Sequence, residues 1–257
     1  MFTGLQHGLY NRSTAMLLSI ETNLDRMLRV WLVVAGLLCA ARVSIGVLVT
    51  GGAGVGTVAP YFLLVLAPVV STLLALKWFA DAHLQPQPKT RLAVVGRWRS
   101  VSQAEAREHP LYGTSGIMVS LLLGMLLNIP VRAAEYLTAM PPVPSVAPQW
   151  LSTLSVAMAF DVVLFCSLYM IAFVAALRKA PLFPRLLLAI WIADVTMQLA
   201  IAKIVTQAPG LPVAVGGALH SLLEGNVTKV LISATLWLPY LLLSRRVNVT
   251  YRSRVSA

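Results

Sequence analysis

The C-terminal stretch, residues 219–257, reads LHSLLEGNVTKVLISATLWLPYLLLSRRVNVTYRSRVSA. Within it, the segment 227–243 is largely apolar and holds one charged residue, Lys229. A purely basic tail follows, with Arg245, Arg246, Arg252 and Arg254. Because Lys and Arg in short flanking segments resist translocation, this pattern predicts a membrane-spanning helix that ends on the cytoplasmic side.

The composition of the whole chain also favours lipid as its solvent. Of the 257 residues, 58% are hydrophobic and 11% are charged, whereas a soluble domain carries about 25% charged residues. The formal net charge is +11, but no basic stripe is interleaved with aromatic residues, so we expect no nucleic-acid partner. Cys39 and Cys166 both lie in apolar runs and suggest neither a disulfide framework nor a metal site.

Five further apolar runs precede the C-terminal one. Each reaches or nearly reaches the roughly 20 residues that cross about 30 Å of hydrocarbon. We place them at 30–49, 58–79, 115–137, 151–177 and 183–205, with an uncharged loop at 206–217 before the sixth span. The sequence therefore predicts an all-α integral membrane bundle of six transmembrane helices, which makes up the domain 30–257.

The segments outside the spans are short, with two exceptions. In residues 1–29, apolar residues recur at helical spacing, which predicts an amphipathic helix that lies on the cytoplasmic interface or packs on the bundle. These apolar residues are Met16, Leu17, Ile20, Leu24, Met27 and Leu28. The basic loop 80–114 is the longest polar segment, and we expect a short surface helix in it at 102–108. The loop 138–149 is rich in proline and uncharged.

The distribution of basic residues predicts the orientation of the bundle. Three Lys or Arg residues precede the first span, six lie at 77–107, three at 178–185 and four in the tail. The loops on the other side, 50–57, 138–150 and 206–219, contain none. By the positive-inside rule, both termini are therefore expected in the cytoplasm, and we expect a bacterial inner-membrane protein.

Ionisable and amide side chains inside the spans are the candidate functional residues, because such groups are costly in lipid. They are Arg42, Arg132, Glu135, Asp161, Asp194, Gln198, His220, Glu224, Asn226 and Lys229. Most are expected in the outer half of the bilayer, with Asp161 and Asp194 near the midplane. Three interpretations stay open: ion pairs that hold the helices together, an outward-facing pocket for a small ligand or a lipid headgroup, and a proton or ion pathway.

Catalytic and metal-binding motifs are weak in this sequence. Ser115 in a G-x-S-G-like context and His220 resemble the serine and histidine of rhomboid intramembrane proteases, which also have six spans. The helix lengths, however, separate these two residues by on the order of 25 Å, too far for a nucleophile and its base. His220 and Glu224 supply two metal ligands without a third nearby. We therefore assign no catalytic residue, no metal and no cofactor, and whether the chain is an enzyme stays open.

The C-terminal region resembles a known family. The residues Trp237-Leu238-Pro239-Tyr240, then Ser244-Arg245-Arg246-Val247, then Thr250-Tyr251 are similar to the ending of a bacterial membrane family called domain of unknown function 2569. The family pattern has Phe where Tyr251 stands here. Phe183-Pro184-Arg185 and Asp194 are similar to the same family, so the resemblance covers residues 178–251. It implies a small multi-pass inner-membrane protein and no particular chemistry.

These patterns favour a non-enzymatic membrane protein as the first functional hypothesis. We expect an accessory or partner-binding subunit whose outward-facing polar cluster is a candidate site for a small ligand from the outer side or a lipid headgroup. Arg245 and Arg246 are expected to contact anionic headgroups of membrane lipids. The alternatives are a small transporter or proton- or ion-coupled carrier that uses the same charges, and a lipid-modifying membrane enzyme.

Overall fold

The structure is a computed structural model that describes residues 2–52, 54–89, 92, 96–140, 143–144 and 147–257. For residues 2–11 and 83 it describes the backbone alone. Within these residues, six helices are long and apolar enough to cross a membrane, which confirms that part of the sequence prediction. They are α1 (Phe2–Thr50), α2 (Val55–Trp78), α4 (Met118–Ala139), α5 (Gln149–Leu177), α6 (Phe183–Thr206) and α7 (Val213–Leu243).

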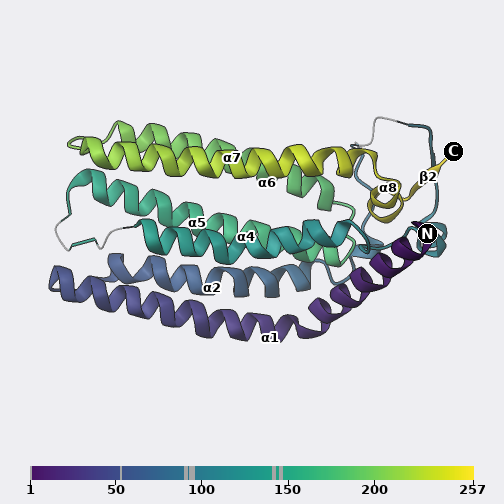
Figure 1. Ribbon diagram of the computed structural model, residues 1–257, viewed down its shortest axis with the longest axis horizontal. Coiled ribbons are helices and arrows are strands. Elements are labelled where there is room, and N and C mark those ends of the chain that lie inside the picture. The colour runs from purple at the N-terminus through teal and green to yellow at the C-terminus, as the bar shows by residue number, and fades with distance from the viewer. Residues whose placement is uncertain (1, 53, 90–91, 93–95, 141–142, 145–146) are drawn as a thin grey trace.

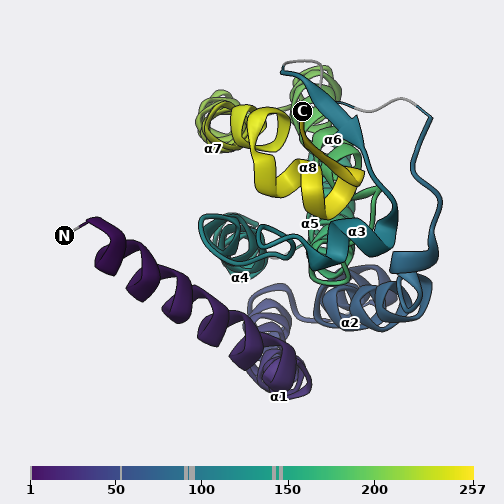
Figure 2. The same ribbon diagram turned by 90° about the vertical axis from the view of Figure 1, so that its right-hand side faces the viewer.

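The six long helices form three antiparallel pairs stacked on one another, α1 with α2, α4 with α5, and α6 with α7 (Figures 1 and 2). Helix α5 lies at the centre and packs against α2, α4 and α6. Its sequence suits this position, because small Ala residues alternate with Phe and Val, so that neighbouring helices approach closely. Phe165, Phe173 and the run Val174–Ala176 have no exposed surface at all.

Helix α1 differs from the expected boundary at residue 29. It is one continuous helix through that point, and its N-terminal part leaves the bundle at an angle (Figures 1 and 2). Leu17 and Leu24 are buried, and Ile20 and Leu28 pack beside the core. The apolar stripe found in the sequence therefore faces the bundle along part of this segment.

The sixth span begins earlier than the sequence suggested. The loop expected at 206–217 ends at Pro212, and helix α7 begins at Val213. Pro212 has extended backbone and its carbonyl accepts the amide of Gly216, so the residue acts as a helix start. Residues 213–217 are uncharged, so the charge pattern of the sequence did not mark them as part of the helix.

Both termini lie at the same end of the bundle, where the remaining short elements gather (Figure 1). These elements are the 3₁₀ helix η1 (Ala82–Leu84), β1 (Trp98–Ser100), α3 (Gln103–Glu108), α8 (Arg245–Arg252) and β2 (Arg254–Ser256). The expected surface helix is thus present as α3, and the Ser102 hydroxyl caps it by accepting the Glu105 amide at 3.1 Å. Arg91, Pro141 and Pro142 of the two loops lie outside the described residues.

The basic tail folds back on the bundle, a feature that the sequence interpretation missed. Strand β2 pairs antiparallel with β1, so a two-stranded ribbon joins the tail to the loop 80–114. Tyr251 of α8 is buried, donates its hydroxyl hydrogen to the Ala176 carbonyl at 2.9 Å, and packs its ring at a tilt against that of Phe183. The C-terminal end of the chain is therefore a packed cap on the helical bundle.

Candidate functional site

The polar residues of the spans occupy positions in the buried stripes of their helices. On α5, Asp161 continues the buried stripe of Leu154 and Met158, and Phe165 follows it. On α6, Asp194 and Gln198 stand in a stripe that contains Leu187, Trp191, Ile201 and Val205. Because residues three and four apart share one face of a helix, these polar groups point into the bundle together with the apolar core.

Arg132 of α4 joins the two aspartates. Its Nη2 lies 2.7 Å from Asp194 Oδ1 and its Nη1 lies 2.9 Å from Asp194 Oδ2, a bidentate contact. Nη2 also lies 3.1 Å from Asp161 Oδ2, and Nε lies 3.3 Å from the same oxygen. The three side chains are 10%, 4% and 1% exposed for Arg132, Asp161 and Asp194, so one guanidinium binds three helices together inside the protein.

Three further side chains complete this charged cluster. Tyr169 donates its hydroxyl hydrogen to Asp194 Oδ2 at 3.1 Å, and Gln198 donates to Asp161 Oδ1 at 2.8 Å. The Phe165 ring lies 4.6 Å from the Arg132 guanidinium carbon, a cation–π contact. We call Arg132, Phe165, Asp161, Tyr169, Asp194 and Gln198 the charged core.

A chain of polar contacts leads from the charged core to α7. Asn226 donates to Gln198 Oε1 at 3.3 Å, and the Lys229 ammonium lies 3.5 Å from Asn226 Oδ1. Lys229 also forms an ion pair with Glu135 of α4, so it bridges α4 and α7. With both aspartates ionised, the charged core carries two negative charges and one positive charge, whereas the Glu135–Lys229 pair is neutral. Unpaired charge in a low-dielectric interior is costly, so the two carboxylates depend on the Arg132 guanidinium.

Helices α4 and α7 border a groove on either side of the Glu135–Lys229 pair. Toward the termini it forms a pocket of about 270 Å³, whose lining includes Asn128, Tyr169, Lys229 and Ser233. Toward the other end it forms a pocket of about 480 Å³ between α4, α5 and α7. We call the two pockets together the α4–α7 groove. The Tyr169 side chain belongs both to this groove and to the charged core, although Arg132, Asp161 and Asp194 line neither pocket.

Five of the sequence-based candidates lie apart from the charged core and from the polar contacts that connect it to α7. Arg42 of α1 donates to the Met140 carbonyl at the end of α4, and its Nε has no partner within the described residues. His220 and Glu224 face one another on α7 at 3.9 Å, with side chains 80% and 71% exposed. Arg245 is exposed at the start of α8, while Arg246 donates to the Ser115 hydroxyl at 2.8 Å.

Sequence reasoning missed Tyr169 and Phe165. Both are aromatic residues in an apolar span, and nothing in their immediate sequence distinguishes them from core residues. Phe165 and Tyr169 stand four and eight residues after Asp161 on α5, so they share its face, and this spacing was the available signal. Within the described residues, no group of three His, Cys, Asp or Glu side chains could hold a metal ion.

No protein-family model, curated protein or solved structure matches this chain. The resemblance of residues 178–251 to domain of unknown function 2569 therefore stays a prediction. The geometry of the charged core and of the α4–α7 groove carries the functional argument.

Proposed function

We propose that this chain is a multi-pass protein of a bacterial inner membrane that acts as a partner-binding subunit of a membrane complex and catalyses no reaction itself. The α4–α7 groove is the proposed surface that receives a transmembrane helix of the partner. The observation that carries the proposal is the polar lining of this groove halfway along two membrane-length helices, where Asn128, Lys229 and Ser233 meet it. Lipid tails offer such groups no hydrogen bonds, whereas a polar side chain on a partner helix does.

The charged core supports this proposal because its members bind one another. Arg132 uses its guanidinium on two carboxylates, and Gln198 and Tyr169 occupy further carboxylate lone pairs. The core therefore holds α4, α5 and α6 in fixed positions. Lys229 contacts Glu135 and Asn226, and an ammonium has three donors, so one donor stays free for a group in the groove.

Photo-crosslinking from the groove tests the proposal. A photoreactive amino acid is placed at Val131 or Ser233, which line the groove, and at Phe62, an exposed residue of α2, as the control. We expect one membrane protein to be captured from Val131 and Ser233 and not from Phe62. The same protein should co-purify with the unmodified chain in stoichiometric amount after extraction in mild detergent.

A second variant shows whether the polar lining matters. Asn128→Leu removes an amide that lines the groove and keeps a side chain of similar size, and it should reduce co-purification of the partner while the chain keeps its thermal unfolding midpoint in detergent. Equal capture from all three positions, or capture of lipid alone from the groove, would overturn the proposal.

One observation favours a second function, proton- or ion-coupled transport. The two aspartates share one guanidinium, and polar contacts of 2.8, 3.3 and 3.5 Å connect Asp161 through Gln198 and Asn226 to Lys229. Such a sequence of groups can accept and pass a proton. Proton flux into vesicles that contain the purified protein tests this function: flux that Asp161→Asn abolishes supports it, and the same slow leak with and without the protein excludes it.

A further inference from the structure

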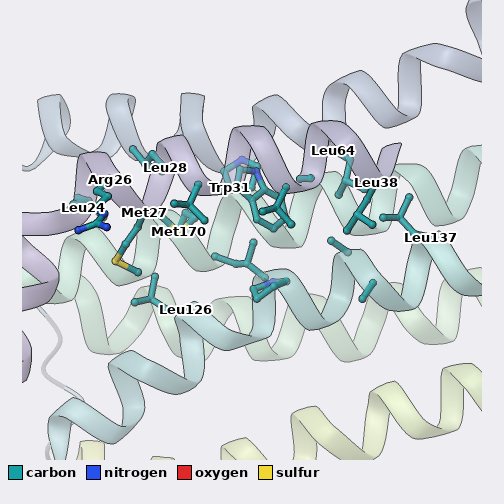
Figure 3. A pocket seen from close by; sticks show the side chains of 18 residues that line it. Leu24, Arg26, Met27, Leu28, Trp31, Leu38, Leu64, Leu126, Leu137 and Met170 are labelled. Carbon is teal, nitrogen blue, oxygen red and sulfur yellow. The ribbon is translucent and has the colours of Figure 1, made fainter. Parts of the chain in front are cut away.

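A second groove runs between α1 and α4, on the other side of α4 from the α4–α7 groove. It is a pocket of about 490 Å³, with α1 and α4 as walls and residues of α2 and α5 at its base. Eighteen of the described residues line it, and all of these but Arg26 are apolar (Figure 3). The Trp31 indole N–H donates to the Val65 carbonyl at 2.9 Å. Because this bond satisfies its polar group, Trp31 presents an apolar ring to the groove. We call this pocket the α1–α4 groove.

The shape of the groove follows from its walls. Helix α1 packs on α2 and touches α4 little. Alanines at 35, 133 and 134 leave room where larger side chains would have closed the gap. Along α1 the lining extends from Leu24 to Leu38, about 21 Å at 1.5 Å per residue. One leaflet of hydrocarbon is about 15 Å thick, so the groove is long enough for an extended acyl chain.

The single cation lies at one end of the groove. Figure 3 shows Arg26 beside Leu24 at that end, whereas Leu38 and Leu137 lie at the other. Arg26 belongs to the end of the bundle that carries both termini, which by charge is the expected cytoplasmic side. Its side chain is exposed and forms no ion pair with the described residues. A guanidinium at headgroup level matches a phosphate, which it can bind with two parallel hydrogen bonds.

The geometry points to a binding site for an anionic phospholipid, with one acyl chain in the α1–α4 groove and the phosphate at Arg26. The contrast with the α4–α7 groove supports this occupant: there the polar groups lie halfway along the helices, where no headgroup reaches, whereas here the one charged residue among the described lining residues lies at the end. The inference rests on the proposed insertion in a membrane and is independent of the proposed partner protein.

Retention of lipid by the purified protein tests the site. The full chain is equilibrated with phosphatidylglycerol or phosphatidylcholine in mild detergent, and native mass spectrometry counts the lipids that stay bound. We expect the anionic lipid to be retained preferentially. Arg26→Gln should reduce its retention about fivefold, the effect of one basic residue on an anionic lipid. Arg29→Gln, one turn away and outside the lining, serves as the control and should change retention less than Arg26→Gln does.

A second pair of variants tests the groove itself. Ala134→Trp fills the groove from an exposed position of its lining, and Ala40→Trp adds the same side chain to an exposed part of α1 outside it. Only Ala134→Trp should displace the lipid, with both variants keeping the unfolding midpoint of the unmodified chain. Equal retention of the two lipids, unchanged retention in Ala134→Trp, or a protein chain captured in the groove would overturn the inference. None of these results bears on crosslinking from Val131 and Ser233.

Discussion

Removing Arg132 and removing one of its two aspartates should lower the stability of the fold by different amounts, because different charges then remain buried. Arg132→Ala would leave Asp161 and Asp194 buried beside each other without a cation, and we expect it to lower stability by about 3–5 kcal/mol. Asp161→Asn leaves one guanidinium opposite one carboxylate and keeps an acceptor for Gln198, so its expected cost is about 1–2 kcal/mol. Thermal unfolding midpoints in detergent measure the two effects.

The order of these two effects is the informative result. A loss for Asp161→Asn as large as that for Arg132→Ala would mean that the core needs both negative charges, as it would if a bound cation balanced them. His220→Ala, which removes an exposed side chain outside the core, is the control and should change stability by less than about 0.5 kcal/mol.

Arg252 is a buried cation of the cap that has no acidic partner within the described residues. Burial, and to a smaller extent the charges of Arg254 and Arg185, together lower the pKa of Arg252 to about 10. Its Nη1 donates to Asn248 Oδ1 at 3.2 Å, and its Nη2 has no partner within the described residues. A base whose folded-state pKa is lowered destabilises the fold at every pH below that value, because the folded state disfavours the bound proton.

Replacing this cation should therefore stabilise the cap. We expect Arg252→Met to raise stability by about 1–3 kcal/mol at neutral pH, since an apolar side chain of similar length replaces a buried charge. Arg245→Met, at an exposed position of the same helix, should have almost no effect. A clear loss of stability in Arg252→Met would mean instead that an anion in the native membrane compensates this charge.

At the scale of elements, the sequence predicted the helices that consist of long apolar runs. The spans expected at 58–79, 151–177 and 183–205 differ from α2, α5 and α6 by at most three residues at either end. A run of this length is a strong signal, because lipid leaves helices as the only open-chain way to satisfy the backbone. The structure of the tail was harder to predict from the sequence. Its elements α8 and β2 are held by contacts with Ala176, Phe183 and β1, which lie far away in the sequence.

The candidate site shows the same division between local and distant information. Spacing along a helix puts Asp194 and Gln198 on one face, and by the same rule Arg132 and Glu135 share one. In the structure Arg132 turns toward α5 and α6, whereas Glu135 turns toward Lys229 of α7. Which neighbour each side chain meets depends on how the helices pack, and spacing within a helix cannot supply that.

The Glu135–Lys229 pair gives a prediction about how α4 and α7 are held. Reversing one charge, as in Glu135→Lys, puts two cations together between these helices and should lower the thermal unfolding midpoint. The double variant Glu135→Lys, Lys229→Glu restores opposite charges and should recover most of the loss. A double variant no more stable than Glu135→Lys alone would indicate that the pair contributes nothing to the α4–α7 arrangement.

The whole molecule has two chemically different ends. One end carries both termini, the cap, the loop 80–114 and nearly all the Lys and Arg residues outside the spans, whereas the turns at the other end are uncharged. If the bundle spans a membrane, this asymmetry fixes its direction, because the basic end resists translocation. The cap supports the same direction. In the opposite orientation, the packed loop and tail would have to cross the membrane together with their charges.

Labelling of single cysteines checks this direction in living cells. After replacement of the buried Cys39 and Cys166 by alanine, one cysteine is placed at the exposed Gln207 beyond α6 or at the exposed Glu108 of α3. A membrane-impermeant maleimide should label Gln207→Cys in intact cells, and Glu108→Cys only after the membrane is opened. The reverse pattern would invert the orientation and move Arg26 to the outer surface. Labelling of both positions in intact cells would contradict a membrane-spanning bundle with a cytoplasmic cap.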